Sequence, residues 1–176
     1  RDHNCDIMHC PQSNLKLANG FCPVVKFIEN EVNVALGTDS AASNNTLDLF
    51  SEIKSASLLA KAVSGDAASL DAHAALRMAT INGAKALAWD NEIGSLELGK
   101  QADIIAVKID SISQQPLYNP ASQLVYTNSG SQVSHSWVAG KMLLENRKLC
   151  TINERSLIQT TEQWRKKIHP DHEHFD

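Results

Sequence analysis

The fold class is decided by one stretch, Val32-Asn33-Val34-Ala35-Leu36-Gly37-Thr38-Asp39, in which a short apolar run ends in polar residues. Such a run is typical of a buried strand. An earlier run, Cys5-Asp6-Ile7-Met8-His9-Cys10, ends at Pro11, so we expect a second buried strand that enters a loop. Between the two runs, residues 23–29 begin with a proline and predict a helix. Strand, helix and strand form one parallel crossover unit, in which ligand-binding groups collect at the carboxyl ends of the strands.

Two long helical patterns and a strand-rich region follow this unit. Residues 47–63 predict a helix capped by Asn45 or Thr46 and closed by Gly65, and the alanine-rich residues 71–88 predict another. After Trp89 the pattern changes. Strands are expected at 104–107, at 123–126 and at 133–144, the last as a hairpin that turns at Gly140-Lys141, and an amphipathic helix is expected at 153–168. We therefore divide the chain into residues 1–90, 91–152 and 153–176.

Length and composition exclude several classes of protein. The 176 residues fall short of the ~250 that a closed (β/α)8 barrel needs, so a complete barrel is excluded. Sixteen Lys and Arg against twenty Asp and Glu give a net charge of −4, which argues against nucleic acid and anionic membranes as partners. No apolar run approaches the ~20 residues of a membrane span. Four cysteines without a C-x-x-C pair favour reduced thiols and a cytoplasmic protein.

Three motifs occur in a fixed order along the chain. They are His9-Cys10-Pro11 with Ser13-Asn14-Leu15-Lys16-Leu17, then Gly37-Thr38-Asp39 with Ser43-Asn44-Asn45, then Gly94-Ser95-Leu96-Glu97-Leu98-Gly99-Lys100-Gln101-Ala102-Asp103. Together they resemble the carboxyl part of the amidohydrolase superfamily, and within it the 5-methylthioadenosine/S-adenosylhomocysteine deaminases and their chlorohydrolase-like relatives. The resemblance implies an α/β chain with the last two βα units of a metal-dependent (β/α)8 barrel, left incomplete here, and the carboxyl-terminal part of a small β-sandwich.

The resemblance also gives Asp39 a catalytic role. It implies that Asp39 binds one divalent metal ion, zinc with iron or manganese as alternatives, and accepts a proton from the metal-bound water, whose pKa zinc lowers toward ~7. The substrate-site candidates are Ser43, Asn44, Asn14 and His9. Ordinary structural roles remain open for all of them: a helix cap or turn for the polar residues and a buried core position for the histidine.

Other histidines attract attention without fitting a metal site. His172-Glu173-His174 copies a His-x-His metal pair, but it lies in a polar tail after Pro170 with no strand to orient it. His73 and His135 have no partner at ligand spacing, so we expect structural roles for both. The Gly94 to Asp103 motif is expected to be architectural, with Gly94 and Gly99 permitting turns.

The implied function is hydrolytic deamination of 5-methylthioadenosine, S-adenosylhomocysteine or adenosine to an inosine-type product and ammonia. This chain would be the carboxyl part of that enzyme, with a purine nucleoside as its substrate. One ligand cannot hold a catalytic zinc, which usually has three protein ligands, so we expect the isolated chain to be inactive and to associate with the missing barrel portion or with copies of itself. Two alternatives stay open: a non-catalytic fragment or subunit, and a triazine- or guanine-type amidohydrolase.

Overall fold

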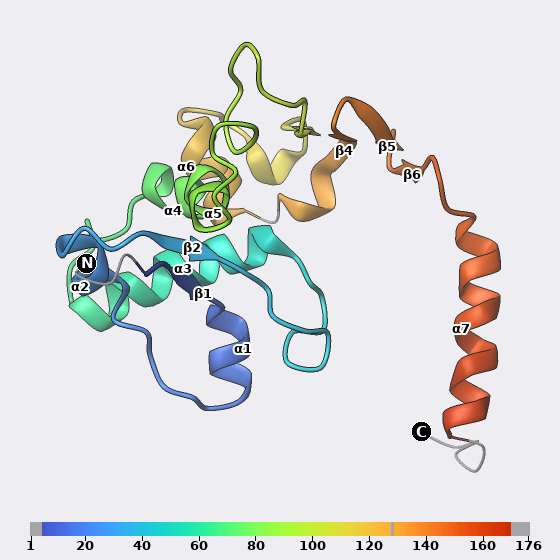
Figure 1. The fold of residues 1–176 in the computed structure, drawn as a ribbon, viewed down its shortest axis with the longest axis horizontal. Coiled ribbons are helices and arrows are strands. Elements are labelled where there is room, and N and C mark those ends of the chain that lie inside the picture. The colour runs from blue at the N-terminus through green and yellow to red at the C-terminus, as the bar shows by residue number, and fades with distance from the viewer. Residues whose placement is uncertain (1–4, 128, 170–176) are drawn as a thin grey trace.

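The computed structural model describes residues 5–127 and 129–169, and it begins with a βαβ unit (Figure 1). Strands β1 (Ile7–His9) and β2 (Val34–Leu36) pair in parallel and are connected through helices α1 (Pro11–Lys16) and α2 (Val24–Glu29). The predicted crossover unit is therefore confirmed. The loop expected directly after Pro11 is wrong, because this proline occupies the first turn of α1, where its fixed φ and missing N–H suit a helix.

Helix α3 (Leu49–Ser64) follows β2 and confirms the helix predicted at 47–63. Its cap is Asp48, whose carboxylate accepts a hydrogen bond from the backbone N–H of Phe50 at 3.0 Å. The predicted caps Asn45 and Thr46 are wrong, since both precede the helix by more than one residue. Gly65 ends α3 in the left-handed conformation, as the sequence predicts.

The single helix predicted at 71–88 is wrong, because the segment forms two short helices, α4 (Ala72–Met78) and α5 (Ile81–Ala86). The backbone leaves helical geometry at Thr80, whose hydroxyl donates to the carbonyl of Leu76 at 2.8 Å. Such back-bonding competes with regular helix geometry. The break redirects α5 toward β2, where the side chain of Asn82 donates to the carbonyl of Val34 at 3.0 Å.

A four-stranded antiparallel sheet forms the second half, in the order β3 (Ile104–Val107), β4 (Val133–Val138), β5 (Lys141–Glu145) and β6 (Lys148–Leu149). The predicted hairpin is confirmed, but the turn predicted at Gly140-Lys141 is wrong. The turn residues are Ala139 and Gly140, both with positive φ, because Lys141 already pairs with Val138 as the first residue of β5. The strand predicted at 123–126 is wrong, because these residues belong to α6 (Pro120–Tyr126). Asn119 caps this helix by accepting from the N–H of Ser122, and short 3₁₀ turns, η1 (Ile112–Gln114) and η2 (Gly130–Gln132), flank it.

The main core lies between the first strand pair and the helices. Val125 of α6 is completely buried in this core together with Val34 and Ile53, and the Tyr126 hydroxyl lies 2.8 Å from Ser57 Oγ on α3. Helix α6 thus packs on α3 and α4 although it follows residue 90, and the division at 90/91 stays a prediction.

Helix α7 (Glu154–Ile168) confirms the last predicted helix, and Figure 1 shows it standing apart from the body. It buries none of its residues. Across residues 5–127 and 129–169, no helix is both long and apolar enough to cross a membrane.

Candidate active site

The carboxyl ends of β1 and β2 place two segments side by side. Because the strands are parallel, the segments that follow β1 and β2 leave the sheet at the same edge. The N–H of Gly37 extends the pairing by donating to the carbonyl of His9 at 3.0 Å. Helix α1 follows β1 at this edge, and the loop of residues 37–48 follows β2. Asp39 comes three residues after the end of β2, and α1 brings Ser13 to it.

Asp39 is exposed and is held by two hydroxyl groups. Ser13 Oγ and Ser43 Oγ each donate to Asp39 Oδ2 at 2.7 Å. The backbone of Asp39 has a φ of 59°, in the left-handed region that aspartate tolerates better than most residues. Hydrogen bonds from Ser43, Ser13 and the backbone of Ser40 hold the pKa of Asp39 below its usual value. The carboxylate is therefore ionised at neutral pH, which is the state that binds a metal.

Two of the four predicted substrate residues lie in the same loop as Asp39. Ser43 is 6% exposed, and its hydroxyl is engaged by Asp39. Asn44 is 3% exposed; its amide donates to Glu52, and its oxygen accepts from the N–H of Leu47 at 3.3 Å. These bonds show both residues ordering the loop. Substrate contact by either one stays a prediction.

The other two candidates, His9 and Asn14, line a different small pocket, between α1 and α3, whose lining does not include Asp39. His9 is 4% exposed, and burial lowers its pKa to about 4. Its Nδ1 atom has no hydrogen-bond partner in the described part of the chain. Asn14 is half-buried on α1. Substrate contact by these two residues likewise stays a prediction.

Two residues that the sequence analysis did not select complete the site. Ser13 supplies one of the two hydroxyls on Asp39. Glu52 is completely buried on α3, where it accepts from the N–H of Gln12 at 3.1 Å and from Asn44. Burial raises the pKa of Glu52. One signal could have found it, because Glu52 lies four residues before the buried Ala56 and thus on the apolar stripe of the helix.

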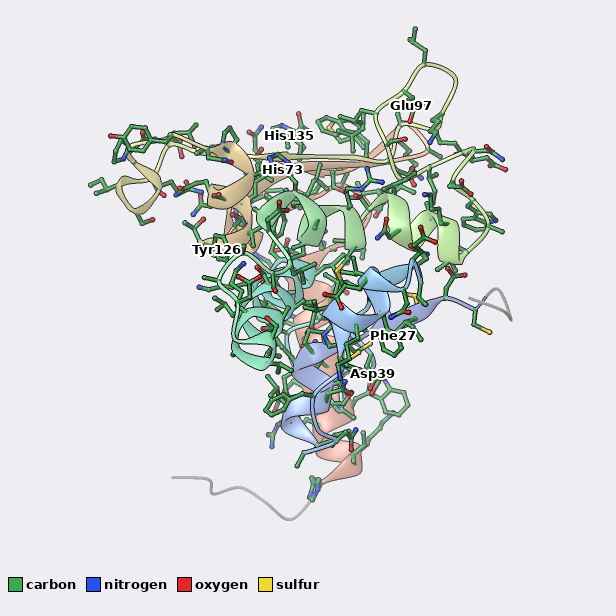
Figure 2. All side chains as sticks on the ribbon, turned by 90° about the vertical axis from the view of Figure 1, so that its left-hand side faces the viewer. Phe27, Asp39, His73, Glu97, Tyr126 and His135 are labelled. Carbon is green, nitrogen blue, oxygen red and sulfur yellow. The ribbon has the colours of Figure 1, made fainter. Side chains whose placement is uncertain are left out.

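Asp39 is the metal ligand that the sequence predicts in this chain. In the described residues, no group of three or more His, Cys, Asp or Glu side chains could hold a metal ion. Figure 2 shows Asp39 well away from His73 and His135. His73 is exposed on α4, whereas His135 stacks on Trp137 with ring centroids 5.5 Å apart. The His172-Glu173-His174 tail lies outside the described residues. Asp39, ionised and exposed, fits the part of one metal ligand in a set of three.

The third sequence motif organises a turn far from Asp39, as the position of Glu97 in Figure 2 shows. Lys100 Nζ donates to the carbonyl of Asp90 and to Ser95 Oγ, each at 2.6 Å. Asp103 accepts from the N–H of Ala139 at 2.7 Å and so joins the turn to the β4–β5 hairpin. The contacts of this third motif hold the turn and the hairpin in place, in agreement with the architectural role predicted for the motif.

Comparison with known proteins places these features in a family. Residues 1–143 match the amidohydrolase family. A 5-methylthioadenosine/S-adenosylhomocysteine deaminase of Teredinibacter turnerae is 53% identical over 162 residues, which are 92% of this chain and 37% of the relative. The crystal structure of an adenosine deaminase from Xanthomonas campestris with bound zinc has a TM-score of 0.91 at 47% identity, covering 94% of this chain and 38% of the other.

A more distant structure is that of an atrazine chlorohydrolase from Arthrobacter aurescens complexed with zinc, with a TM-score of 0.86 at 26% identity, covering 92% of this chain and 36% of the other. The chain thus spans little more than a third of the length of the relatives that it matches. Over that length the match includes both strand-loop segments that meet at Asp39. The chain belongs to the amidohydrolase family.

Proposed function

We propose that this chain is the carboxyl-terminal part of a metal-dependent aminohydrolase that releases ammonia from a purine nucleoside. One observation carries the proposal: an ionised carboxylate, Asp39, stands just beyond a buried parallel strand and is oriented by hydroxyls from two separate segments. The names of the relatives support a substrate of the 5-methylthioadenosine, S-adenosylhomocysteine or adenosine type.

The proposed architecture follows from the strand pairing. We infer that β1 and β2, with the helices after them, are the last two βα units of a (β/α)8 barrel, and that β3 to β6 belong to a β-sandwich. Parallel pairing of β1 and β2 supports the first part, and the antiparallel order of β3 to β6 supports the second. The rest of such a barrel corresponds to the length of the relatives that this chain does not cover.

In this function Asp39 acts through its charge. A bound metal ion, zinc with iron or manganese as alternatives, supplies an activated water at neutral pH. Asp39 contributes one carboxylate to the set of metal ligands and offers an acceptor for a proton. Ser13 and Ser43 hold the plane of this carboxylate by their bonds to Oδ2. These bonds also lower the pKa of Asp39 and so favour its ionised form, which is the form that binds a metal.

The surroundings of the reaction are also proposals. The remaining metal ligands would come from the part of the barrel that this chain does not cover, and we propose that the chain associates with that part or forms a homo-oligomer. The spacing of the four cysteines, with no C-x-x-C pair, supports a reducing, cytoplasmic location. The net negative charge supports a small-molecule substrate in preference to nucleic acid or a membrane surface.

A chimaera tests the proposal directly. The matching part of the Teredinibacter relative is replaced by this chain, and ammonia release is measured with the three nucleosides, with guanine and with a triazine. We expect turnover of at least one nucleoside, and we expect Asp39→Asn to lower kcat by ~100-fold or more and to reduce zinc below one per chain. Retention of both zinc and rate by the Asp39→Asn protein would show that the role of Asp39 is assigned wrongly.

The same experiment decides between the alternatives. Turnover of a triazine without any nucleoside would favour the chlorohydrolase-like alternative, which the similarity to atrazine chlorohydrolase supports. The non-catalytic alternative for the isolated chain rests on the missing three-ligand cluster among the described residues. Stoichiometric zinc bound by the isolated 176-residue chain would contradict that alternative.

A further inference from the structure

Glu52 is a buried carboxylate for which the proposed reaction has no direct use. It lies in the first turn of α3, is 0% exposed, and is followed by the buried apolar residues Ile53 and Ala56. An ionisable side chain in such a place is costly unless hydrogen bonds compensate for the loss of water. The hydrogen-bond partners of Glu52 therefore indicate the role of this side chain.

Both carboxylate oxygens of Glu52 accept hydrogen bonds, and the donors come from two different segments. The N–H of Gln12, in the first turn of α1, donates to Oε2 at 3.1 Å. The side-chain amide of Asn44, in the loop after β2, donates to Oε1. In the sequence, Gln12 directly precedes Ser13 and Asn44 directly follows Ser43. Each donor to Glu52 is thus the neighbour of one of the hydroxyls that bind Asp39.

A second connection between the segments exists on the outside of the site. Lys16 Nζ donates to the carbonyl of Ala42 at 2.8 Å and to Asn45 Oδ1 at 2.7 Å. These bonds are exposed, and exposed polar contacts of a lysine contribute little to order. The bonds of Glu52 are charge-assisted, the one from Asn44 is buried and the one from Gln12 is partly buried, and their loss would leave the completely buried carboxylate unsatisfied. Glu52 is therefore the principal connection.

We propose that Glu52 is a positioning residue, which binds Gln12 and Asn44 and thereby sets the separation at which Ser13 and Ser43 meet on Asp39. The inference rests on the proposed function, because it takes Asp39 as a metal ligand. Glu52 makes no described bond to Asp39 itself and acts only through the two serines. Loss of Glu52 lets the segments separate, so that the hydroxyls no longer hold the carboxylate in one orientation.

The test measures zinc affinity in the metal-free chimaera, by competition with a chromophoric chelator. Glu52→Gln keeps the size of the side chain but turns one acceptor oxygen into an NH₂ group that faces a donor. We expect the zinc dissociation constant to rise by ~10-fold, the usual effect of disturbing groups that orient a metal ligand. In a Ser13→Ala/Ser43→Ala background the same substitution is expected to change it by less than about twofold, since the route to Asp39 is then absent.

Ser57 provides a matched control on the same helix. It is completely buried, and its hydroxyl bonds the carbonyl of Leu70 and lies 2.8 Å from the Tyr126 hydroxyl, both away from Asp39. Ser57→Ala is expected to lower stability and to leave the zinc dissociation constant within about twofold. If circular dichroism shows that Glu52→Gln does not fold, Asn44→Ala replaces it. This variant removes the hydrogen bond between Asn44 and Glu52 from the side of the donor, and we expect it to weaken zinc binding as well.

Three results would overturn the inference. The first is an unchanged zinc affinity after Glu52→Gln, or after Asn44→Ala where that variant replaces it. The others are an equal loss of zinc affinity in the Ser13→Ala/Ser43→Ala background, or an equal loss of zinc affinity with Ser57→Ala. Asp39→Asn separates this inference from the proposed function. If Asp39→Asn leaves zinc affinity unchanged, the proposed function fails. If Asp39→Asn abolishes zinc binding while Glu52→Gln preserves it, only the role of Glu52 fails.

Discussion

His9, at the end of β1, carries the pH dependence that we expect of the folded state. Burial lowers its pKa from 6.5 to about 4. As the pH falls, the unfolded chain takes up the proton first, so the stability due to neutral His9 is complete above about pH 6.5 and is lost as the pH falls toward about 4. The loss is on the order of 3 kcal/mol in the free energy of unfolding.

His9→Gln is the comparison for this effect, because glutamine has no charge to gain. We expect the chimaera to lose more stability than its His9→Gln variant in urea unfolding across that pH range. An NMR titration of the His9 imidazole checks the cause. A midpoint close to the ordinary histidine value would contradict the expectation.

The candidate site was predictable only where local sequence determines it. Asp39 follows an apolar run directly, so both its place after a strand and its motif are visible in the chain. Its contact with Ser13 joins residues 26 positions apart, and the bond between Gln12 and Glu52 spans 40 positions. Such contacts depend on how α1, the loop after β2 and α3 come together. No local pattern encodes how these elements come together, so Ser13 was missed. For Glu52 the local pattern indicates a position on the apolar stripe of its helix, but not the contacts with Gln12 and Asn44.

At the scale of elements, the turn before β3 depends on Gly94. Its φ is +90°, and a Cβ there would lie 2.7 Å from the Cβ of Ala84 and 3.0 Å from the Cα of Ile81 in α5. Gly94→Ala therefore combines an unfavourable backbone conformation with a clash, and we expect it to lower the free energy of unfolding by about 2–4 kcal/mol.

Gly99→Ala is the matched control for this prediction. Gly99 has a similar φ of +92°, but nothing lies within 4 Å of its added Cβ. Only the backbone cost remains, about 1 kcal/mol. Urea unfolding of the three proteins, followed by circular dichroism at one protein concentration, gives both values. Equal losses at the two glycines would show that the approach to α5 is unimportant.

The sequence mispredicts two segments, and in each of them the local pattern conflicts with capping, side-chain or packing interactions. The run Gln123-Leu124-Val125-Tyr126 has the apolar and β-branched content of a strand, but Asn119 and Pro120 just before it form a helix start, and packing on α3 and α4 favours the helix. In the alanine-rich segment, the hydroxyl of Thr80 and the contact of α5 with β2 divide a helix that composition predicts as continuous.

At the scale of the whole molecule, the first sheet determines how the chain is expected to behave. It contains β1 and β2 alone, so within residues 5–127 and 129–169 the outer edge of each strand has no neighbouring strand. Parallel sheets normally occur with several strands and with both faces covered. Length alone excluded a closed barrel. The observed pairing adds that two short parallel strands carry the site.

These open edges, together with α7, predict self-association of the isolated chain. Exposed apolar residues lie along this helix, namely Leu157, Ile158, Trp164 and Ile168. Unpaired strand edges and exposed apolar faces bind other chains. We therefore expect light scattering to give a mass above the 19.2 kDa monomer, one that falls on dilution. Trp164→Ser with Ile168→Ser is expected to lower this mass, whereas Thr160→Ser in the same helix is not. A monomeric mass throughout the dilution series, with one sharp unfolding transition, would contradict the prediction, because the strands and α7 would then be stable without any covering surface.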